Sequence, residues 1–475
     1  MAASGARRPE PVWLLLAGLV SGLVAATLRG LVLFDDALAH GYDGWYYVIQ
    51  TESWAAGAPE FADNSLAFWL LAALSVPFGA ILGNKLAALL GAFVMALGGV
   101  VAGWRWTRSV PAAWVCGLWL GASPLLLGVS SEYLKNALGL ALLPWVLALL
   151  AGEKPWERVG ALVLLVVGLF VHKLSGVMGW VLAAGIVGTQ VLVPRIGPRL
   201  KVPGWLLVLG GLGGMAALAF GVLRAEDLQR LLSMEGGRPR LQALLGGRIR
   251  VGELAELGLL AVAPGVLLWR AWASERERPL AIAGLLLAVL CLAPGLPFGW
   301  DLTAWRLMLV GGIPVALMCT LLSAAAPEVM VPIVLASLAS LVPMVVQANQ
   351  AREPDYLAFA ANLPLLQDSE KVVAHRGICG QIMAQTGVHC ENFQPPEPHQ
   401  GWTRVVYGVS MRYLAPVAPD AVDLAGPYVM VPEPQWQAFV AGPGADWFLV
   451  SDPRNPYRAR PDFVYGSQAS EGQND

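Results

Sequence analysis

The chain has 475 residues, of which 56% are hydrophobic and 13% are charged, and its mean hydropathy is +0.59. Soluble proteins carry about 25% charged residues, so this chain has too few charges to cover a globule with polar surface. The composition therefore excludes an ordinary soluble protein and predicts a membrane protein. The net charge of −2, without a basic tract, gives no indication of a nucleic-acid partner, and we expect none.

The first apolar segment, Val12–Phe34, follows the N-terminal sequence MAASGARRPEP. The two arginines before it also fit a secretory signal peptide, with Val24–Ala26 as a cleavage site. However, the apolar stretch continues past that site and is longer than the roughly 20 residues that span a bilayer. We therefore expect an uncleaved first transmembrane helix.

Residues 1–348 are predicted to form an α-helical polytopic domain with about eleven transmembrane helices. The predicted spans are Val12–Phe34, Lys85–Trp104, Pro111–Val129, Ala137–Ala151, Val159–Val171, Val177–Val193, Gly204–Leu223, Gly258–Trp272, Ala281–Phe298, Trp305–Ala325 and Val329–Val346. One more apolar segment, Ser65–Leu82, is interrupted by Pro77 and Gly79. It either spans the bilayer or lies flat at its surface.

The positive charges favour the flat placement of Ser65–Leu82. In that layout twelve Lys and Arg residues lie on one side and four in the short connections on the other, as expected if the first side is cytoplasmic. The outer loop 224–257 is an exception, because it carries six arginines. The flat placement also gathers polar residues on one outer face, namely Asp43, Glu132, His172, Asp301 and Arg306.

The first outer loop, residues 35–64, contains the sequence HGYDGWYY at positions 40–47. Gly44 permits a close backbone approach next to Asp43, and the aromatic rings exclude water, which should raise the pKa of the Asp43 carboxyl. We interpret Asp43 as functional, with Tyr46 and Tyr47 as substrate contacts. The other acids of the loop have the pattern of solvated residues, and they include Glu52, Glu60 and Asp63.

The second outer turn is SSEYLKN, residues 130–136. It can be an ordinary capped turn, in which Ser130 or Ser131 is the N-cap and Glu132 lies in the first helical turn. It can also belong to a site, because five polar residues exceed what a chain reversal needs. The two interpretations are compatible, and the candidate site residues here are Glu132, Lys135 and Asn136.

Two further outer turns carry VHKLSG and GWDLTAWR. His172 alone would be an ordinary surface histidine, but beside two acids it becomes a candidate metal ligand or substrate contact, together with Lys173. Asp301 and Arg306 either pair with each other or leave Arg306 to bind a phosphate. The outer loop 224–257 contains two amphipathic pieces. It is either a basic helix on lipid headgroups or a lid whose arginines, Arg238 and Arg240 among them, hold an anionic headgroup.

The motifs YDGWYY, the flat segment NSLAFWLLAALSVPFG, the basic turn WRWTRS and the acidic turn SSEYLKN resemble the GT-C glycosyltransferases. These integral membrane enzymes take sugars from polyprenyl-phosphate carriers, and the resemblance extends to relatives of the aminoarabinose and protein mannosyl transferases. It covers residues 1–180 well and the later helices only by general layout. Two features depart from the family, since Gly44 stands where a second acid is usual and Glu132 is a single acid.

The resemblance implies transfer of the sugar, with inversion, to a lipid or glycan acceptor at the outer face of the inner membrane. Asp43 would be the general base. Glu132 and His172 would position the acceptor or, with Asp43, hold Mg²⁺ or Mn²⁺. The candidate substrate contacts are Tyr46, Tyr47, Lys135, Asn136, Lys173, Arg238, Arg240, Asp301 and Arg306.

Residues 349–475 are polar and rich in proline, and we expect a small extracytoplasmic α/β domain. The predicted strands are Lys371–His375, Tyr428–Val431 and Trp447–Val450, and the predicted helices are Gly377–Gln385 and Pro434–Val440. The spacing of Cys379 and Cys390 suits a disulfide, with two free thiols as the alternative. A zinc site with His375, His389 and His399 fits no standard spacing. Trp402, Trp436 and Trp447 are assigned to core packing unless they contact a sugar.

Two other functions remain open from the sequence. A transporter or flippase would carry charged residues inside its helices and inverted repeats, whereas these helix interiors are almost free of charge and no repeat is found. A non-catalytic protein with the same fold is the second alternative.

Overall fold

The computed structural model of the chain divides into two compact units, which we describe separately. One comprises residues 1–44 and 50–349, and the other comprises residues 350–475 together with 45–49. The residues whose structure is described are 11–34, 37–40, 43–60, 63–192, 251–292, 302–336, 339, 355–374, 376–391, 401–407, 414, 416, 418–425 and 428–441.

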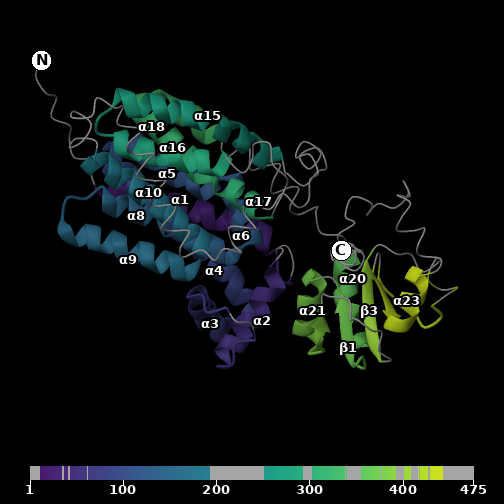
Figure 1. The fold of residues 1–475 in the computed structure, drawn as a ribbon. Helices are drawn as coiled ribbons and strands as arrows, with labels where there is room; N and C mark the ends of the chain where they lie inside the picture. Colours follow the sequence, from purple (N-terminus) through teal and green to yellow (C-terminus); the bar gives the residue numbers. More distant parts are fainter. Residues whose placement is uncertain are drawn as a thin grey trace, which may run out of the picture. The chain divides into compact units, whose positions relative to one another are not determined.

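The first unit is a bundle of apolar helices (Figure 1). Within the described ranges, four segments are long and apolar enough to cross a bilayer: α1 (Pro11–Leu33), α4 (Ala80–Thr107), α15 (Val251–Ala273), and the pair α17 (Leu302–Val310) and α18 (Gly312–Ala325) from Arg306 onward. The helices α5 (Val110–Ala122) and α6 (Pro124–Glu132) make a fifth if they are taken as one span bent by 41°. These segments confirm five of the predicted apolar spans.

The other described helices of the bundle are shorter. They are α7 (Leu134–Leu140), α8 (Leu143–Leu150), α9 (Pro155–Val171), α10 (Lys173–Val187) with its π-helical extension η1 (Gly188–Leu192), and α16 (Arg278–Leu292). A 3-10 turn, η3 (Pro327–Val329), leads into apolar helix up to Ala336. The predicted span 204–223 and half of 329–346 lie outside the described residues, so the number of about eleven spans stays a prediction.

The break between α5 and α6 follows from the local sequence Ser123-Pro124. Proline is favoured in the first helical position, where its missing N–H costs no hydrogen bond. Ser123 caps the new helix, because its hydroxyl accepts a hydrogen bond from the Leu126 N–H at 3.1 Å. The chain therefore starts a separate nine-residue helix, α6, that ends at Glu132.

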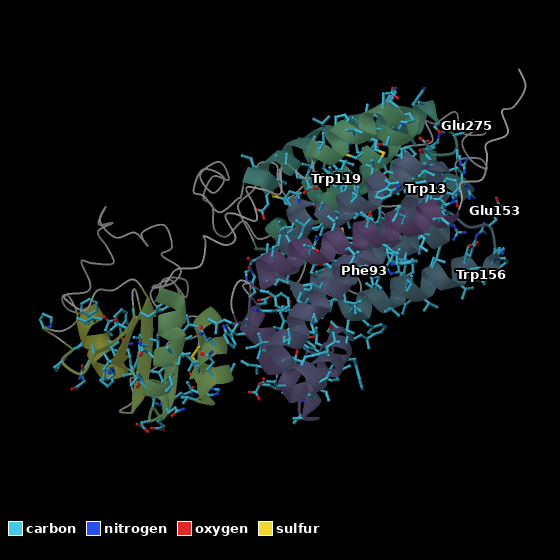
Figure 2. The ribbon with its side chains drawn as sticks, turned by 180° about the vertical axis from the view of Figure 1, so that it is seen from behind. Trp13, Phe93, Trp119, Glu153, Trp156 and Glu275 are labelled. Atoms are coloured by element: carbon cyan, nitrogen blue, oxygen red, sulfur yellow. A yellow bond between two sulfur atoms is a disulfide. The ribbon has the colours of Figure 1, made fainter. Side chains whose placement is uncertain are left out.

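One end of the bundle, which we call the basic end, collects the positive charges. Figure 2 shows Trp13 of α1, Glu153 and Trp156 at the α8–α9 connection, and Glu275 at the α15–α16 connection together at this end. Two ion pairs lie there, Arg105 with Glu157 and Arg270 with Glu277. The cationic residues of these connections are Arg105, Arg108, Lys154, Arg158, Arg270, Arg276 and Arg278. This asymmetry agrees with the charge distribution that the sequence predicts.

The helix α3 (Ala67–Phe78) does not cross the bundle. Twelve residues extend about 18 Å, which is less than the roughly 30 Å of bilayer hydrocarbon. The N–H of Leu66 donates to the Phe170 carbonyl at the end of α9, and the Thr51 hydroxyl donates to Asn84 in the first turns of α4. Both ends of α3 therefore lie at the end of the bundle opposite the basic end, which we call the site end. The helix α3 alone therefore does not span the bundle, and its flat orientation at the membrane surface stays a prediction.

One boundary of the sequence prediction is wrong. Residues 251–257 form the first turns of α15, whereas we expected them in the outer loop 224–257. Glu253 and Glu256 in this segment are only 3% and 1% exposed, so they belong to the interior of the bundle. The rest of that loop lies outside the described residues.

The second unit contains a five-stranded mixed sheet with strand order β2-β1-β3-β5-β4. Strand β1 (Lys371–Ala374) runs parallel to β2 (Cys390–Glu391) and β3 (Trp402–Tyr407), and β5 (Tyr428–Pro432) runs antiparallel to β3 and β4 (Val422–Ala425). The described helices of this unit are α20 (Asp355–Asn362), α21 (Arg376–Thr386) and α23 (Glu433–Ala441), with the 3-10 turn η4 (Leu363–Leu366) after α20.

The small α/β fold is confirmed, with two of the predicted strands and both predicted helices in place. Strands β2, β3 and β4 and helix α20 were not predicted, and the expected strand 447–450 lies outside the described residues. Trp436 is 4% exposed and packs against Phe439, as expected of a core residue. Trp402 is half-buried, with the Lys371 ammonium 4.6 Å from its ring centre, and Trp447 lies outside the described residues.

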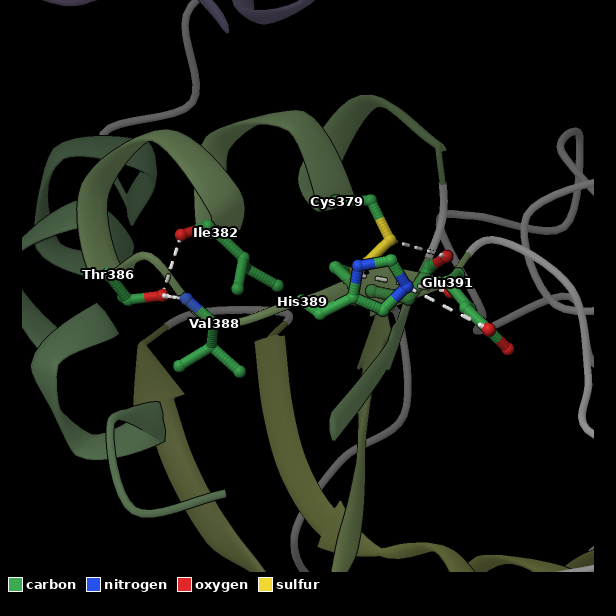
Figure 3. Close-up of a disulfide and its surroundings, with 8 residues drawn as sticks. Cys379, Ile382, Thr386, Val388, His389 and Glu391 are labelled. Carbon is green, nitrogen blue, oxygen red and sulfur yellow. Dashed lines mark hydrogen bonds and ion pairs between the residues drawn. A yellow bond between two sulfur atoms is a disulfide. The ribbon is translucent and has the colours of Figure 1, made fainter. Parts of the chain in front are cut away.

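Cys379 of α21 and Cys390 of β2 form a disulfide (Figure 3). The predicted pairing is confirmed, and the alternatives of free thiols or zinc ligation by these cysteines are excluded. His389 lies beside the bridge with Nε2 3.8 Å from Glu391, while His375 and His399 lie outside the described residues. On the chain-entropy model, a loop of this size contributes about 3 kcal/mol to stability.

Candidate active site

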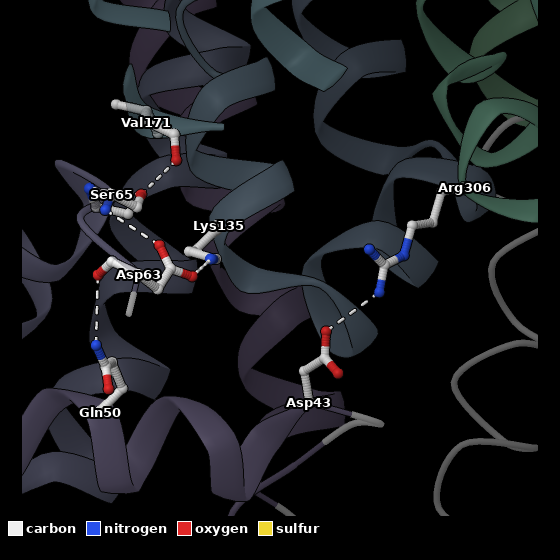
Figure 4. Close-up of polar contacts among 8 residues, drawn as sticks. Asp43, Gln50, Asp63, Ser65, Lys135, Val171 and Arg306 are labelled. Atoms are coloured by element: carbon white, nitrogen blue, oxygen red, sulfur yellow. Dashed lines mark hydrogen bonds and ion pairs between the residues drawn. The ribbon is translucent and has the colours of Figure 1, made fainter. Parts of the chain in front are cut away.

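Asp43 directly precedes α2 (Gly44–Ala55), and its carboxylate makes no capping hydrogen bond to that helix. Instead, Oδ2 accepts a hydrogen bond from the guanidinium of Arg306 on α17 at 3.3 Å (Figure 4). A Cβ atom on Gly44 would lie 3.3 Å from the backbone of Ala39, so the expected close backbone approach is present. Arg306 thus pairs with Asp43. A pairing with Asp301 was one of the two alternatives from the sequence, and Asp301 lies outside the described residues.

The guanidinium of Arg306 lies over the ring of Tyr133, with its central carbon 4.1 Å from the ring centre. Tyr133 is 4% exposed, and burial raises the pKa of its hydroxyl to about 12, so the ring stays neutral at physiological pH. The Nε of Arg306 is buried and has no hydrogen-bond partner among the described residues. One face of the guanidinium therefore lies against the aromatic ring, and its Nε–H is a donor without an acceptor among the described residues.

Glu132 is the last residue of α6, next to Tyr133. The capping interpretation of this turn is wrong, because Ser130 and Ser131 donate hydrogen bonds back to the carbonyls of Leu126 and Gly128 within α6. A carboxylate at a helix C-terminus is disfavoured by the helix dipole. The charges of Glu132 and Asp43 both act on the Tyr133 hydroxyl, so the two acids lie at the same end of the bundle.

Asp63 is a structured residue, whereas we expected it to be solvated. Its carboxylate forms an ion pair with Lys135 of α7 and accepts a hydrogen bond from the Ser65 N–H at 3.1 Å, as Figure 4 shows. Its backbone carbonyl accepts a bond from the Gln50 side chain at 3.3 Å. Lys135 also lies 5.2 Å from the ring centre of Phe68. These contacts tie the first outer loop to α7 at the site end. The other two acids of this loop that we expected to be solvated, Glu52 and Glu60, are exposed.

Asn136 is 1% exposed and joins α7 to α10, because its backbone and side-chain carbonyl oxygens share the single proton that the Ser175 hydroxyl donates. Its side-chain nitrogen has no partner among the described residues. His172 occupies the N-cap position of α10, where its Nδ1 accepts a hydrogen bond from the Ser175 N–H at 3.4 Å. The neutral ring therefore carries its proton on Nε2. His172 therefore caps α10, and the charges of Lys135 and Arg306 also act on its ring.

We expect His172 to stay neutral throughout the physiological pH range. Burial, with the positive charges of Lys135 and Arg306, lowers its pKa from 6.5 to about 3. Because the unfolded chain binds this proton more readily, the contribution of His172 to stability decreases as pH falls from 6.5 towards 3. The pKa can be measured by NMR titration of the His172 ring protons, which are assigned by their absence from the spectrum of His172→Gln. A titration midpoint near pH 6.5 would contradict the expectation.

The remaining predicted contacts are distributed as follows. Tyr46 and Tyr47 lie in the first turn of α2 with their rings edge to face at 5.5 Å, and Tyr47 is buried. Lys173 is exposed at the start of α10. Asp301, Arg238 and Arg240 lie outside the described residues.

A metal site of Asp43, Glu132 and His172 stays a prediction. In the part of the chain that the structure describes, no three His, Cys, Asp or Glu side chains are grouped as metal ligands. The Asp43 carboxylate accepts a hydrogen bond from Arg306. The Nδ1 of His172 accepts the capping hydrogen bond of α10, so Nε2 is the ring nitrogen that does not take part in the cap.

Sequence reasoning did not select three residues that matter at this end of the bundle. Tyr133 lies inside the motif SSEYLKN but was not singled out, although it supports Arg306. Arg29 and Glu256 are 0% and 1% exposed inside the bundle, where the sequence suggested nearly charge-free helices. An arginine within an apolar span was a usable signal, because such residues are rare and are retained for a reason.

No protein-family model matches the chain, and no curated protein matches its sequence. Solved structures of similar fold include two of ArnT. ArnT from Cupriavidus metallidurans bound to undecaprenyl phosphate is 14% identical with a TM-score of 0.54, covering 88% of this chain and 98% of that chain. The same ArnT in the apo state is 14% identical with a TM-score of 0.53, covering 89% of this chain and 98% of that chain.

The likeness extends over both units of the chain, since it covers nearly nine-tenths of its length. At this identity the likeness concerns the fold. The apolar helices and this likeness identify the chain as a multi-pass α-helical membrane protein. The chain therefore has a fold similar to that of ArnT over nearly nine-tenths of its length.

Proposed function

We propose that this protein is a membrane glycosyltransferase that moves a sugar from a polyprenyl-phosphate carrier to a lipid or glycan acceptor. The observation that carries the proposal is the cluster of Asp43, Arg306 and Tyr133 at one end of an ArnT-like bundle. ArnT itself is known bound to undecaprenyl phosphate, an anionic lipid of the proposed carrier class. A carboxylate and a guanidinium in one cluster supply the two groups that such a transfer requires.

The pairing of Asp43 with Arg306 suggests how donor binding prepares the base. A phosphate ester is a strong acceptor for a guanidinium, and the buried Nε of Arg306 offers a donor besides the one given to Asp43. We expect the donor phosphate to compete with Asp43 for Arg306. Binding would then release the Asp43 carboxylate to accept a proton, while Tyr133 keeps the guanidinium in place.

In the proposed reaction, an acceptor hydroxyl or amine attacks the anomeric carbon of the sugar and loses its proton to Asp43. The bond between the anomeric carbon and the phosphate oxygen breaks, and its electron pair leaves with the polyprenyl phosphate. Arg306 stabilises the charge that develops on that phosphate. A single displacement of this kind inverts the anomeric centre.

The other candidates take supporting roles in this proposal. Lys135 is held by Asp63 and Lys173 is exposed, so both can add positive charge near the phosphate. Glu132 and the Nε2–H of neutral His172 are proposed to position the acceptor. If a divalent cation takes part, Mg²⁺ or Mn²⁺ on Asp43 and Glu132 fits the preference of these ions for oxygen ligands.

We further propose that the basic end faces the cytoplasm and the site end faces the outer side of the inner membrane. The disulfide of the second unit supports this orientation, because disulfides persist in oxidising compartments. In this arrangement the site and the second unit share the extracytoplasmic side.

A transporter is the less favoured alternative. The buried charges that transport requires are present as Arg29 and Glu256, contrary to the sequence expectation. However, their exposures of 0% and 1% and their bonds to backbone and side-chain groups give no open route along them.

Mass spectrometry of envelope lipids and glycans from cells with and without the gene tests the proposal. We expect one species to lose the mass of a single sugar when the gene is removed, and to regain it with the wild-type gene. Identical profiles in both strains, with the protein verified in the membrane of the first, would argue against a transferase.

A further inference from the structure

Glu256 of α15 is a buried carboxylate that holds the beginning of α6. Its Oε1 accepts a hydrogen bond from the Trp119 indole at 2.7 Å, and Oε2 accepts bonds from the Ser123 hydroxyl at 2.7 Å and the Leu125 N–H at 2.9 Å. The Ser123 hydroxyl accepts from the Leu126 N–H, so its own proton is free to go to Glu256. All three partners are donors, which is the environment of an ionised carboxylate at a helix N-terminus.

Arg29 of α1 contacts the C-terminal part of α6. It is fully buried, its guanidinium donates to the Gly121 carbonyl at the end of α5, and its Nε donates to the Ser130 hydroxyl of α6 at 3.4 Å. Its positive charge interacts with the negative charge of Glu256. The two charges balance within the bundle, as buried ions require.

The middle of α6 is also enclosed by its neighbours. A Cβ atom on Gly128 would lie 2.8 Å from a carboxylate oxygen of Glu253 on α15 and 3.4 Å from Leu309 on α17. The helix α6 therefore contacts α15 at its start and middle, α1 near its end, and α17, which carries Arg306. Its end leads directly into Tyr133, on which Arg306 rests.

We infer that Arg29 and Glu256 form a buried frame that fixes α6 and thereby positions Tyr133 beneath Arg306. We call these two residues the frame. They are positioning residues, because they lie within the bundle and act on the site only through α6. An effect of the frame on donor binding rests on the proposed function. The fixation of α6 by the frame does not depend on it.

Thiol labelling at position 131 tests the fixation directly. Ser131 is 4% exposed in the last turn of α6, and Ser131→Cys is a small change. The native chain is a suitable background, since three of its five cysteines are buried and two form the disulfide. We expect slow labelling of Ser131→Cys by a maleimide in detergent, and labelling about tenfold faster after adding Glu256→Gln or Arg29→Met.

The matched control is Glu277→Gln, which breaks the ion pair of Glu277 with Arg270. Both residues are 8% exposed at the basic end. Arg270 lies in the last turn of α15 and Glu277 in the connection to α16. We expect this variant to lower the melting temperature without changing the labelling rate of Ser131→Cys. Equal acceleration in the control, or no acceleration in Glu256→Gln, would overturn the frame.

A double variant separates the hydrogen bonds of the frame from its charge balance. Arg29→Met with Glu256→Gln removes one charge of each sign, so neither is left unbalanced. It also removes the bonds that Arg29 donates and leaves one acceptor oxygen at position 256 in place of two. We expect labelling to remain fast. A return to the slow rate would mean that charge balance alone matters and would overturn the inference.

Binding of undecaprenyl phosphate to the purified full chain in nanodiscs tests the effect on the site. We expect Glu256→Gln to weaken it about tenfold and Glu277→Gln to leave it unchanged, because Arg306 loses its support only in the first. Faster labelling with unaltered binding would overturn the positioning role. If the unsubstituted chain does not bind this lipid, the proposed function fails, and the labelling result still decides whether the frame fixes α6.

Discussion

Replacing Asp43 by asparagine is expected to reduce sugar transfer by about 10²- to 10⁴-fold, the range associated with loss of a general base. Asparagine keeps the shape of the side chain and can still accept a hydrogen bond from Arg306, but it cannot take a proton from the acceptor. Because the amide is neutral, it competes less well for Arg306. Undecaprenyl phosphate should therefore bind Asp43→Asn at least as tightly as wild type.

The two effects are measured by mass spectrometry of the transfer product and by lipid binding to the purified protein. Glu60→Gln is a suitable control, since Glu60 is an exposed acid of the same loop. It should leave transfer unchanged. Unchanged transfer by Asp43→Asn at normal protein levels would remove Asp43 from the role of base, even if the protein proved to be a transferase.

Replacing Arg306 by lysine is expected to reduce transfer by about 10²- to 10³-fold and to weaken binding of undecaprenyl phosphate. Lysine keeps the charge but is a compact ammonium that cannot stack on Tyr133 and donate in two directions at once. In the structure Arg306 does both, with the Tyr133 ring 4.1 Å away and Asp43 3.3 Å away. The lipid is therefore expected to lose its main anchor.

Tyr133→Phe serves as the matched variant, because it retains the ring beneath Arg306 and removes only the hydroxyl. We expect it to bind undecaprenyl phosphate nearly as wild type does, whereas Tyr133→Leu should resemble Arg306→Lys. Wild-type binding by Arg306→Lys would show that the phosphate is held elsewhere, and Lys135 would then be the next candidate.

The sequence predicts much of this fold because apolar length and charge are strong local signals. The long spans α1, α4 and α15 follow from them, and so does the prediction that the segment of α3 does not span. The disulfide follows from the short spacing of two cysteines in a polar domain. Strands such as β3 and β4 were missed, since they are brief and depend on pairing with distant segments.

The site was predicted only in part, for a physical reason. Asp43 and Arg306 were each selected from local motifs, but their pairing joins residues 263 positions apart and is set by the packing of α17. Glu132 was expected near a helix start and lies at a helix end, because Ser123-Pro124 starts α6 earlier than the turn suggests. Arg29 was missed although an arginine within an apolar span is a local signal. Glu256 was missed because it was assigned to the outer loop 224–257, and nothing local reveals that its charge interacts with that of Arg29.

The central claim is that Asp43 and Glu132 face the same aqueous compartment. Single cysteines at positions 43 and 132, in the native chain with its buried or bridged thiols, can be labelled in intact cells with a membrane-impermeant maleimide. We predict that both react from outside the cytoplasmic membrane, whereas a cysteine at position 108 of the basic end reacts only after permeabilisation. Labelling of positions 43 and 132 from opposite sides would contradict the proposed site.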